Sequence, residues 1–360
     1  MKVLVASAFY PTNDGKKALY YVHSRNLYYK MEGIDVTELN FSAKEGYTFD
    51  GIKVISLKEY EQEKEEYDIL ICHAPNLRNH YRFLRKYGKC FAKKIFVFHG
   101  QEILHRKKYY PKPYEFVKNS KLRNLIQNPY DDLKISIWKK YCLKNIDDIR
   151  LVFVSDWIYK QFLKETKCSK EQLGDKVSII SNSIGKYFEN HSYNTKDIEY
   201  DFITVRANLD GSNYSIDIVA DLAAKHPEYK FCIMGNGKFF DYREKPDNVI
   251  LKKGEFNHED IANYLNKSKY ALLPTREDTQ GLMGCEMASY GIPLITSDIE
   301  VCRLIFDSCE NVALISNNNP DLIKAVNKLK EKSVNGKWTK FFAENTIYKE
   351  IDLIKKYYNE

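Results

Sequence analysis

Residues 271–298, with the sequence ALLPTREDTQGLMGCEMASYGIPLITSD, decide the fold. An apolar run ends at Pro274 and Thr275, a loop with acidic residues follows, and a helix-like segment over 282–289 leads to Gly291. Glycine just past a helix, with proline soon after it, is a common helix stop. A second apolar run follows directly. Two such strands joined by a helix form the crossover unit of a parallel sheet, so this stretch predicts an α/β fold.

Short apolar runs of the same kind recur along the whole chain. Most are four to seven residues long and apolar on both parities, as expected of strands buried on both faces of a parallel sheet. The first series lies at 2–9, 36–41, 52–57, 68–73, 94–99, 150–154 and 176–181. The second series lies at 201–205, 229–234, 248–252, 270–274, 293–296 and 312–315. The segments between them are long enough for crossover helices, for example at 18–30, 217–225, 258–267 and 320–331.

Two successive series of this kind indicate two doubly wound, Rossmann-like domains. A polar stretch without strands, over 186–199, separates them, so we predict a first domain over 1–190 and a second over 191–336. The remaining segment, 337–360, is predicted to contain a C-terminal helix over 338–358. Ligands of doubly wound domains bind outside the carboxyl ends of the strands. We therefore expect the site in a central cleft that both domains face.

Composition excludes several classes of protein. The chain has 360 residues, of which 44% are hydrophobic and 29% charged, as in ordinary globular proteins and unlike disordered, collagen-like or coiled-coil chains. No apolar run approaches the ~20 residues of a membrane span, and the start, KVLVASAF, resembles a strand rather than a signal peptide. Eight cysteines occur without a CxxC pair, which favours reduced core thiols over a disulfide or zinc framework. We expect a soluble, cytoplasmic protein.

The first half of the chain carries a basic region rich in aromatic residues. Residues 76–94 contain seven Lys/Arg and no acid, and residues 101–145 contain eleven against four acids. The aromatic residues among them include Tyr109, Tyr110, Tyr114, Phe116 and Trp138. Such a region suits anionic lipid headgroups, a diphosphate-bearing acceptor or nucleic acid. A solvated lysine-rich surface is the alternative interpretation.

Candidate site residues of the first half follow three predicted strands. The first strand leads into 10–17, YPTNDGKK, where Gly15 lets the backbone approach a ligand; an ordinary turn is the alternative. His99 follows a buried strand and precedes a glycine, so we expect it to point into the cleft. His73 ends the preceding strand and is the weaker candidate. For both histidines, a hydrogen-bonded structural role is the alternative.

Candidate site residues of the second half have the chemistry of nucleotide-sugar binding. Arg206 follows a strand, and its planar guanidinium matches phosphate geometry. Asp278 precedes the helix over 282–289 and Glu286 lies within it, with the amides of Gly281 and Leu282 at its start. Helix-end amides bind a diphosphate and carboxylates bind sugar hydroxyls. Gly235 begins a G-x-G that indicates a tight turn and little more.

These features together resemble the retaining GT-B glycosyltransferases of family 4, the "group 1" glycosyltransferases. The family pattern is an acid, seven residues, then Glu-Ala-Met-Ala-x-Gly-x-Pro, which here reads Asp278-x7-Glu286 followed by MASYGIP. Further similar positions appear in the family's order over almost the whole chain: His99-Gly100, Val154-Ser155, Asn182-Ser183-Ile184, Arg206, Gly235-x-Gly237 and Asn248-Val249 with Gly254. The resemblance implies a GT-B fold whose C-terminal helix crosses back to the first domain.

The resemblance also implies roles for individual residues. Glu286 would bind the donor ribose, Asp278 the hydroxyls of the transferred sugar, and His99 would lie beside the anomeric centre. Arg206, Gly281 and Leu282 would neutralise the diphosphate. The other implied donor contacts are Gly15 at the phosphates, Gly235, and the turn of Gly254 and Phe256 at the base. We assign acceptor binding to Asn13, Lys16, Lys17 and His73.

The sequence departs from the family pattern near the phosphates. The first acid is Asp278 where the family usually has Glu, and Glu277 adjoins it as a substitute by a small shift. The family's phosphate-binding lysine, a few residues after the arginine, has no clear counterpart. Asn208 and Ser212 are the residues that we assign to donor binding there instead.

The predicted function is transfer of a sugar from a nucleotide diphosphate sugar to a hydroxyl, with retention, in surface polysaccharide or glycolipid assembly. We predict no metal and no cofactor besides the nucleotide sugar as co-substrate, because no Asp-x-Asp motif occurs in the chain. Expected partners are a glycan or lipid-linked acceptor and, at the inner membrane face, anionic lipid; nucleic acid is not expected. One alternative is a degenerate GT-B scaffold that binds nucleic acid or membrane, and a nucleotide-sugar 2-epimerase is another.

Overall fold

The computed structural model describes residues 1–15, 18–63, 65–118, 121–195, 197–331 and 337–360. The chain folds into two compact units. Unit 1 consists of Met1–Arg106, Asn128–Asn182 and Thr346–Glu360, and unit 2 of Lys107–Gln127 and Ser183–Asn345. Relative to the predicted boundaries at 190 and 336, unit 2 also takes in 107–127, 183–190 and the stretch from 337 to 345.

Unit 1 is built on one eight-stranded sheet with the order β3-β4-β2-β1-β5-β6-β7-β8. The strands are β1 Lys2–Ser7, β2 Asp35–Asn40, β3 Tyr47–Phe49, β4 Ile52–Ile55, β5 Ile69–His73, β6 Lys93–Phe98, β7 Ile149–Phe153 and β8 Val177–Ile179. All neighbours pair in parallel except β3, which runs antiparallel to β4. The seven predicted strands are confirmed. The three-residue β3 was not predicted, because a run that short carries no periodicity.

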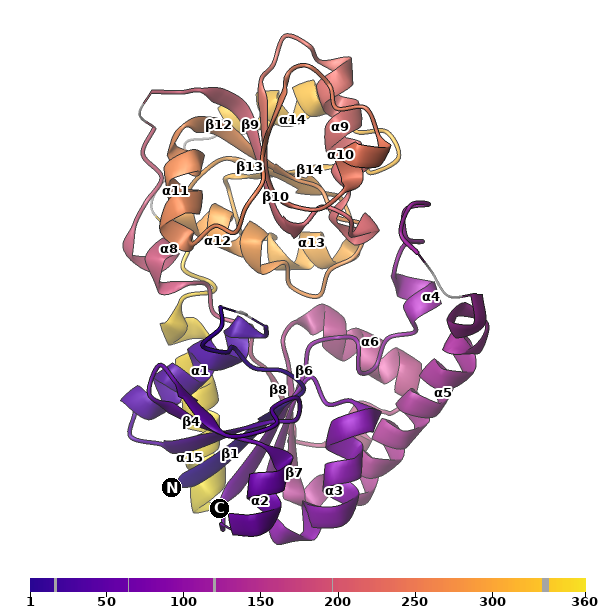
Figure 1. The fold of residues 1–360 in the computed structure, drawn as a ribbon, viewed down its shortest axis with the longest axis vertical. Coiled ribbons are helices and arrows are strands. Elements are labelled where there is room, and N and C mark those ends of the chain that lie inside the picture. The colour runs from indigo at the N-terminus through magenta and orange to yellow at the C-terminus, as the bar shows by residue number, and fades with distance from the viewer. Residues whose placement is uncertain (16–17, 64, 119–120, 196, 332–336) are drawn as a thin grey trace. The chain divides into compact units, whose positions relative to one another are not determined.

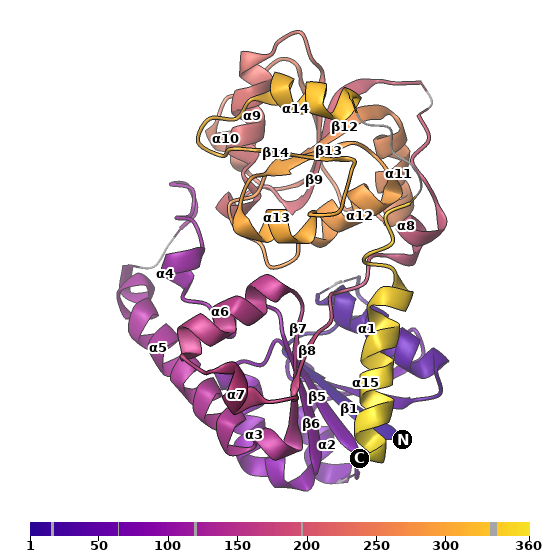
Figure 2. The same ribbon diagram turned by 180° about the vertical axis from the view of Figure 1, so that it is seen from behind.

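Helices cover both faces of this sheet (Figures 1 and 2). One face carries α1 (Tyr20–Met31) and α15 (Ile347–Asn359), and the other carries α2 (Leu57–Glu63), α3 (Arg82–Tyr87) and α5 (Lys121–Lys144). The remaining helices and helical turns are η1 Leu77–Tyr81, η2 Gly88–Cys90, α4 Arg106–Tyr109, η3 Ile146–Asp148, α6 Asp156–Thr166 and α7 Lys170–Leu173.

The C-terminal helix α15 belongs to unit 1, as the fold prediction requires. A buried ion pair holds it: Arg25 Nε of α1 lies 2.9 Å from Glu350 Oε2 of α15, and both side chains are at most 1% exposed. Tyr29 donates a hydrogen bond to the same carboxylate at 2.6 Å. The prediction that this helix spans 338–358 was wrong at its start, because the helix begins at Ile347 and only a short turn, η5 (Ala343–Asn345), precedes it.

Unit 2 is built on a six-stranded parallel sheet with the order β11-β10-β9-β12-β13-β14. The strands are β9 Tyr200–Asn208, β10 Phe231–Asn236, β11 Val249–Lys252, β12 Ser268–Leu273, β13 Leu294–Ser297 and β14 Val312–Ile315. Figures 1 and 2 show α9 (Ile216–Lys225) and α14 (Leu322–Lys330) on one face, and α11 (His258–Asn266), α12 (Leu282–Tyr290) and α13 (Glu300–Ile305) on the other. The shorter elements are α8 Lys186–Asn190, η4 Ser212–Tyr214 and α10 Phe239–Tyr242. All six predicted strands are confirmed.

Both units thus have the doubly wound architecture that their apolar runs predict. Seven of the eight cysteines are buried, and Cys90 is exposed, so the prediction of core thiols holds for all but that one. Within the described part of the chain, none of the helices is long and apolar enough to cross a bilayer.

Candidate active site

Arg206 lies near the carboxyl end of β9 and is almost fully buried, at 7% exposure. Its Nη2 donates a hydrogen bond to the carbonyl oxygen of Pro274 at 2.8 Å, and its guanidinium lies over the ring of Tyr214. Its Nε is buried and finds no hydrogen-bond partner among the described residues. Burial lowers the pKa of Arg206, and the nearby Asp278 carboxylate opposes that shift. A buried cation with an unused donor is well suited to an anionic ligand.

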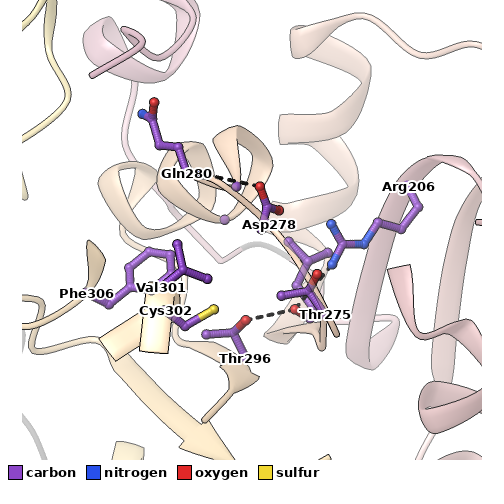
Figure 3. A pocket seen from close by; sticks show the side chains of 11 residues that line it. Arg206, Thr275, Asp278, Gln280, Thr296, Val301, Cys302 and Phe306 are labelled. Atoms are coloured by element: carbon purple, nitrogen blue, oxygen red, sulfur yellow. Dashed lines mark hydrogen bonds between the residues drawn. The ribbon is translucent and has the colours of Figure 1, made fainter. Parts of the chain in front are cut away.

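The loop between β12 and α12 brings the carboxylate of Asp278 to a pocket that Arg206 also lines. Figure 3 shows Arg206 and Asp278 together at its wall, with Cys302 and Phe306 of the α13 region opposite. Oδ1 of Asp278 accepts hydrogen bonds from the amides of Thr279 and Gln280, at 2.7 and 3.3 Å. These bonds fix the carboxylate within the loop. The predicted proximity of Arg206, Asp278 and Gly281 is therefore present in unit 2.

The start of α12 is arranged for an anion. Gly281, the N-cap residue, has φ +73°, and no described side chain caps the helix. A Cβ at this position would lie 3.1 Å from Asp278 Oδ2, so glycine fits both the backbone and the space. Because no side chain caps them, the first amides of α12, beginning with Leu282, are available to a phosphate.

Glu277 and Asp278 are adjacent but differ in environment. Asp278 lines the pocket, whereas Glu277 is buried and its Oε1 has no hydrogen-bond partner among the described residues. Burial, with help from the Asp278 charge, raises the pKa of Glu277 to about 8. Glu277 is therefore mostly protonated at neutral pH, and Asp278 is the acid of this loop that faces the pocket.

Glu286 of α12 is held by residues that the sequence did not indicate. Its Oε1 accepts a hydrogen bond from the amide of Gly185 at 3.1 Å and lies 3.5 Å from Nε2 of His258. Burial raises the pKa of Glu286, and His258 and the Gly185 amide oppose the shift. A Cβ on Gly185 would lie 2.2 Å from Cε1 of His258, so any side chain there would displace the histidine. Both contacts fall on Oε1, which leaves Oε2 for a ligand.

The other predicted donor residues of unit 2 have mainly structural contacts. At Gly235 the backbone of β10 approaches β9 so closely that a Cβ would lie 1.8 Å from the carbonyl oxygen of Arg206. Asn208 is exposed and accepts a hydrogen bond from the amide of Asp210, while Ser212 is buried and begins η4. Phe256 packs against the φ +154° turn at Gly254. Their roles as donor contacts remain predictions.

In unit 1, His99 and His73 form a pair at the carboxyl ends of β6 and β5. Nδ1 of His73 lies 3.3 Å from Nε2 of His99, and the ring of Tyr21 packs 4.6 Å from that of His99. His73 is fully buried, whereas His99 is partly exposed. Burial, together with the charge of Arg25, holds the pKa of both histidines well below the usual range. Both are therefore neutral at pH 7, and the more buried His73 contacts the ring of His99.

The predicted first loop of unit 1 is only partly described. Gly15 has φ +94° and its amide donates to the carbonyl of Thr12, as in a tight turn. Asn13 is exposed and donates to the carbonyl of Thr48. Lys16 and Lys17 lie outside the described residues. That His99, Gly15 and the unit 2 pocket face one cleft remains a prediction.

No group of three or more His, Cys, Asp or Glu in the described chain is placed to hold a metal ion. At the pocket, Arg206 supplies a cation, and the amides at the start of α12 supply neutral hydrogen-bond donors.

Two sequence comparisons match this chain to glycosyltransferases. A family model described as "Glycosyl transferases group 1" matches residues 202–332, all within unit 2. An uncharacterised glycosyltransferase of Methanocaldococcus jannaschii is 22% identical over 348 residues, which cover 90% of this chain and 86% of the relative.

Solved structures match almost end to end. Sucrose-phosphate synthase from Thermosynechococcus elongatus has a TM-score of 0.69 at 11% identity and covers 99% of this chain and 98% of its own. The E. coli trehalose-6-phosphate structure bound with UDP-2-fluoro glucose has a TM-score of 0.61 at 12% identity, with coverages of 99% and 96%. The fold is GT-B. Together, these matches support a glycosyltransferase of the GT-B type.

His258 gives a testable consequence of this site. Replacing it with leucine removes the side chain that lies 3.5 Å from Glu286 Oε1 and should raise the KM for the donor by about threefold to tenfold, the range of an ordinary polar contact. His258→Gln, which retains a hydrogen-bond donor, should raise this KM less. The control is His191→Gln, since His191 is the C-cap residue of α8 and, among the described residues, its ring hydrogen-bonds only the Tyr187 carbonyl. An unchanged KM in the leucine variant would contradict the role given to His258.

Proposed function

We propose that this protein is a retaining, metal-independent glycosyltransferase that moves a sugar from a nucleotide diphosphate sugar to a hydroxyl acceptor. The observation that carries the proposal is the pocket of unit 2, where the buried cation of Arg206 and the uncapped start of α12 adjoin the carboxylate of Asp278. This set combines phosphate-binding donors with a carboxylate for sugar hydroxyls. The family-model match over the same residues supports it.

In this mechanism, the bond between the anomeric carbon and the diphosphate oxygen breaks while the acceptor oxygen attacks from the same face. The proton of the acceptor hydroxyl passes to the departing diphosphate oxygen. Arg206 and the amides of Gly281 and Leu282 stabilise the charge that develops on the leaving group, which is the role of preorganised donors in such sites. Glu286 would orient the ribose through Oε2, and the neutral His99 would hydrogen-bond the transferred sugar.

We further propose that the transferred sugar is a hexosyl group. The proposed acceptor is a glycan or a lipid-linked molecule. The acceptor would bind unit 1 near His99, with Asn13 and the 10–17 loop. Assembly of a surface polysaccharide or glycolipid is the process we propose. The family-model match and the archaeal relative do not favour a degenerate scaffold or an epimerase.

The test is nucleotide release from UDP-, GDP- and ADP-sugars, with and without EDTA, followed by NMR of the product's anomeric proton. The proposal predicts release from one donor class, unchanged by EDTA, with the donor's anomeric configuration kept. Loss of release in EDTA would overturn metal independence. Inversion would overturn retention, and no turnover of any donor would overturn the transferase.

We also propose that the protein docks on anionic membranes through α5. Trp138, which the sequence suggested for this role, is fully buried, and Tyr114 and Phe116 pack against the core of unit 2. Four other side chains of α5 are instead exposed and lie within one side of the helix: Leu125, Ile126, Tyr130 and Leu133. The exposed Arg106, Lys107 and Lys108 of α4 precede them. Apolar residues beside cations are typical of an interfacial helix.

The double variant Leu125→Glu, Ile126→Glu should bind vesicles that contain anionic lipid at least ~10-fold more weakly, because two large apolar side chains no longer enter the lipid. Flotation with phosphatidylglycerol vesicles measures this. Ile323→Glu, on an exposed site of α14, is the matched control and should bind as wild type does. Equal flotation of all three proteins would refute docking through α5.

A further inference from the structure

The segment Lys107–Gln127 makes contacts with unit 2 that neither the proposed catalysis nor the proposed membrane docking accounts for. Lys107–Gln127 interrupts unit 1 in the sequence and belongs to unit 2 in the fold. Phe116 stacks on Tyr242 with ring centroids 4.6 Å apart and planes inclined by 4°, and Tyr114 packs 5.0 Å from Phe239. The segment is therefore anchored on α10 by aromatic rings.

Tyr114 also makes a polar contact that packing alone does not require. Its hydroxyl donates a hydrogen bond to Oδ1 of Asp217, in the first turn of α9, at 2.7 Å. Burial opposes ionisation of Asp217, but hydrogen bonds from Arg276 and Tyr114 outweigh it and hold the pKa of Asp217 below its usual range. Asp217 is thus a carboxylate at neutral pH and serves as the centre of this contact.

Arg276 completes the connection to the pocket. Its Nη1 and Nη2 donate to the two carboxylate oxygens of Asp217 at 2.7 and 2.5 Å, which is a bidentate ion pair. Nη1 also donates to the carbonyl oxygen of Ser212 at 3.0 Å, and the Arg276 amide donates to that of Asn213 at 2.9 Å. Arg276 therefore ties the loop after β12 to the loop after β9, and Asp278 lies two residues further on.

We propose that Tyr114 is a positioning residue for the donor site: through Asp217 and Arg276 it fixes the loop over 276–281 that presents Asp278 and Gly281 to the nucleotide sugar. The donor site rests on the proposed function, whereas the ordering of the loop does not depend on any ligand. The geometry explains why a segment far away in the sequence carries a tyrosine at this point. A phenylalanine would give the same stacking but would leave Asp217 with one partner fewer.

The experiment compares wild type, Tyr114→Phe and Tyr242→Phe as intact proteins. Tyr242→Phe is the matched control, because Tyr242 stands in the same aromatic cluster and its hydroxyl has no described hydrogen bond. Hydrogen exchange by mass spectrometry measures the order of 276–284. Calorimetry measures the affinity for whichever of UDP, ADP and GDP wild type binds most tightly.

We expect faster exchange over 276–284 in Tyr114→Phe and a Kd for the nucleoside diphosphate raised by about fivefold to tenfold. This is less than the full effect of losing a hydrogen bond to a charged group, because Tyr114 acts on the site only through Asp217 and Arg276. Tyr242→Phe should match wild type in both measurements. Unchanged exchange in Tyr114→Phe would overturn the proposal, as would faster exchange with wild-type affinity. If wild type binds none of the three nucleotides, the proposed function fails, and exchange alone then decides whether Tyr114 orders the loop.

Discussion

Replacing Arg206 with methionine is expected to lower nucleotide-sugar turnover by about 100-fold to 1000-fold, the usual effect of removing one preorganised donor from a developing negative charge. Arg206 is the cation of the pocket, and its buried Nε has no hydrogen-bond partner in the described structure. The protein should not lose stability, because exchanging a buried charge for an apolar side chain of similar volume is often neutral or stabilising. Turnover and the thermal midpoint are the two measurements.

Two further variants separate charge from geometry. Arg206→Lys keeps the charge but loses the planar guanidinium, and should fall between wild type and Arg206→Met. Arg243→Met is the matched control, since this partly exposed guanidinium also lies over an aromatic ring, that of Phe239, at 5.9 Å. Turnover by Arg206→Met within a few-fold of wild type would remove Arg206 from the mechanism.

Replacing Glu350 with alanine is expected to lower the free energy of unfolding of unit 1 by about 3–5 kcal/mol, because it leaves the Arg25 charge buried without its partner. Arg25 would retain Asn182 Oδ1 at 2.9 Å, an uncharged acceptor, and Tyr29 would lose the carboxylate that its hydroxyl contacts. Urea unfolding monitored by limited proteolysis of the C-terminus measures the loss and shows whether α15 detaches first.

The surface pair between α15 and the C-cap residue of α1 is the matched control. Lys355 of α15 lies 3.1 Å from Glu32, and both side chains are more than one third exposed. Lys355→Ala should therefore cost about 0–1 kcal/mol. The double variant Arg25→Met with Glu350→Leu should recover most of the loss, since neither charge remains. A Glu350→Ala loss no larger than that of Lys355→Ala would show that the buried pair does not hold α15.

The fold could be predicted because its signals are local. Most of the parallel strands are apolar runs that are visible in the sequence, and α12 has a glycine at its start and another just past its end. The start of α15 was placed too early because 338–346 is as rich in aromatic and apolar residues as a helix, although it forms only a short turn.

The site could be predicted where its residues lie at the carboxyl ends of neighbouring strands of one sheet. Arg206 lies near the end of β9, and Asp278 and Gly281 lie in the loop after β12, the strand next to β9, so the three residues line one pocket. Gly185, His258 and Tyr114 could not be found in this way, since each reaches Glu286 or Asp217 from a distant part of the sequence. Their signal is spatial: a glycine without room for a Cβ, and a hydroxyl directed at a carboxylate.

The crystal structure of the protein with the nucleoside diphosphate chosen by the donor panel tests the central claim most directly. The account predicts that the diphosphate contacts the amides of Gly281 and Leu282 and the guanidinium of Arg206, and that Oε2 of Glu286 accepts hydrogen bonds from the ribose. A nucleotide bound away from this pocket, or a diphosphate that touches neither Arg206 nor the start of α12, would contradict it.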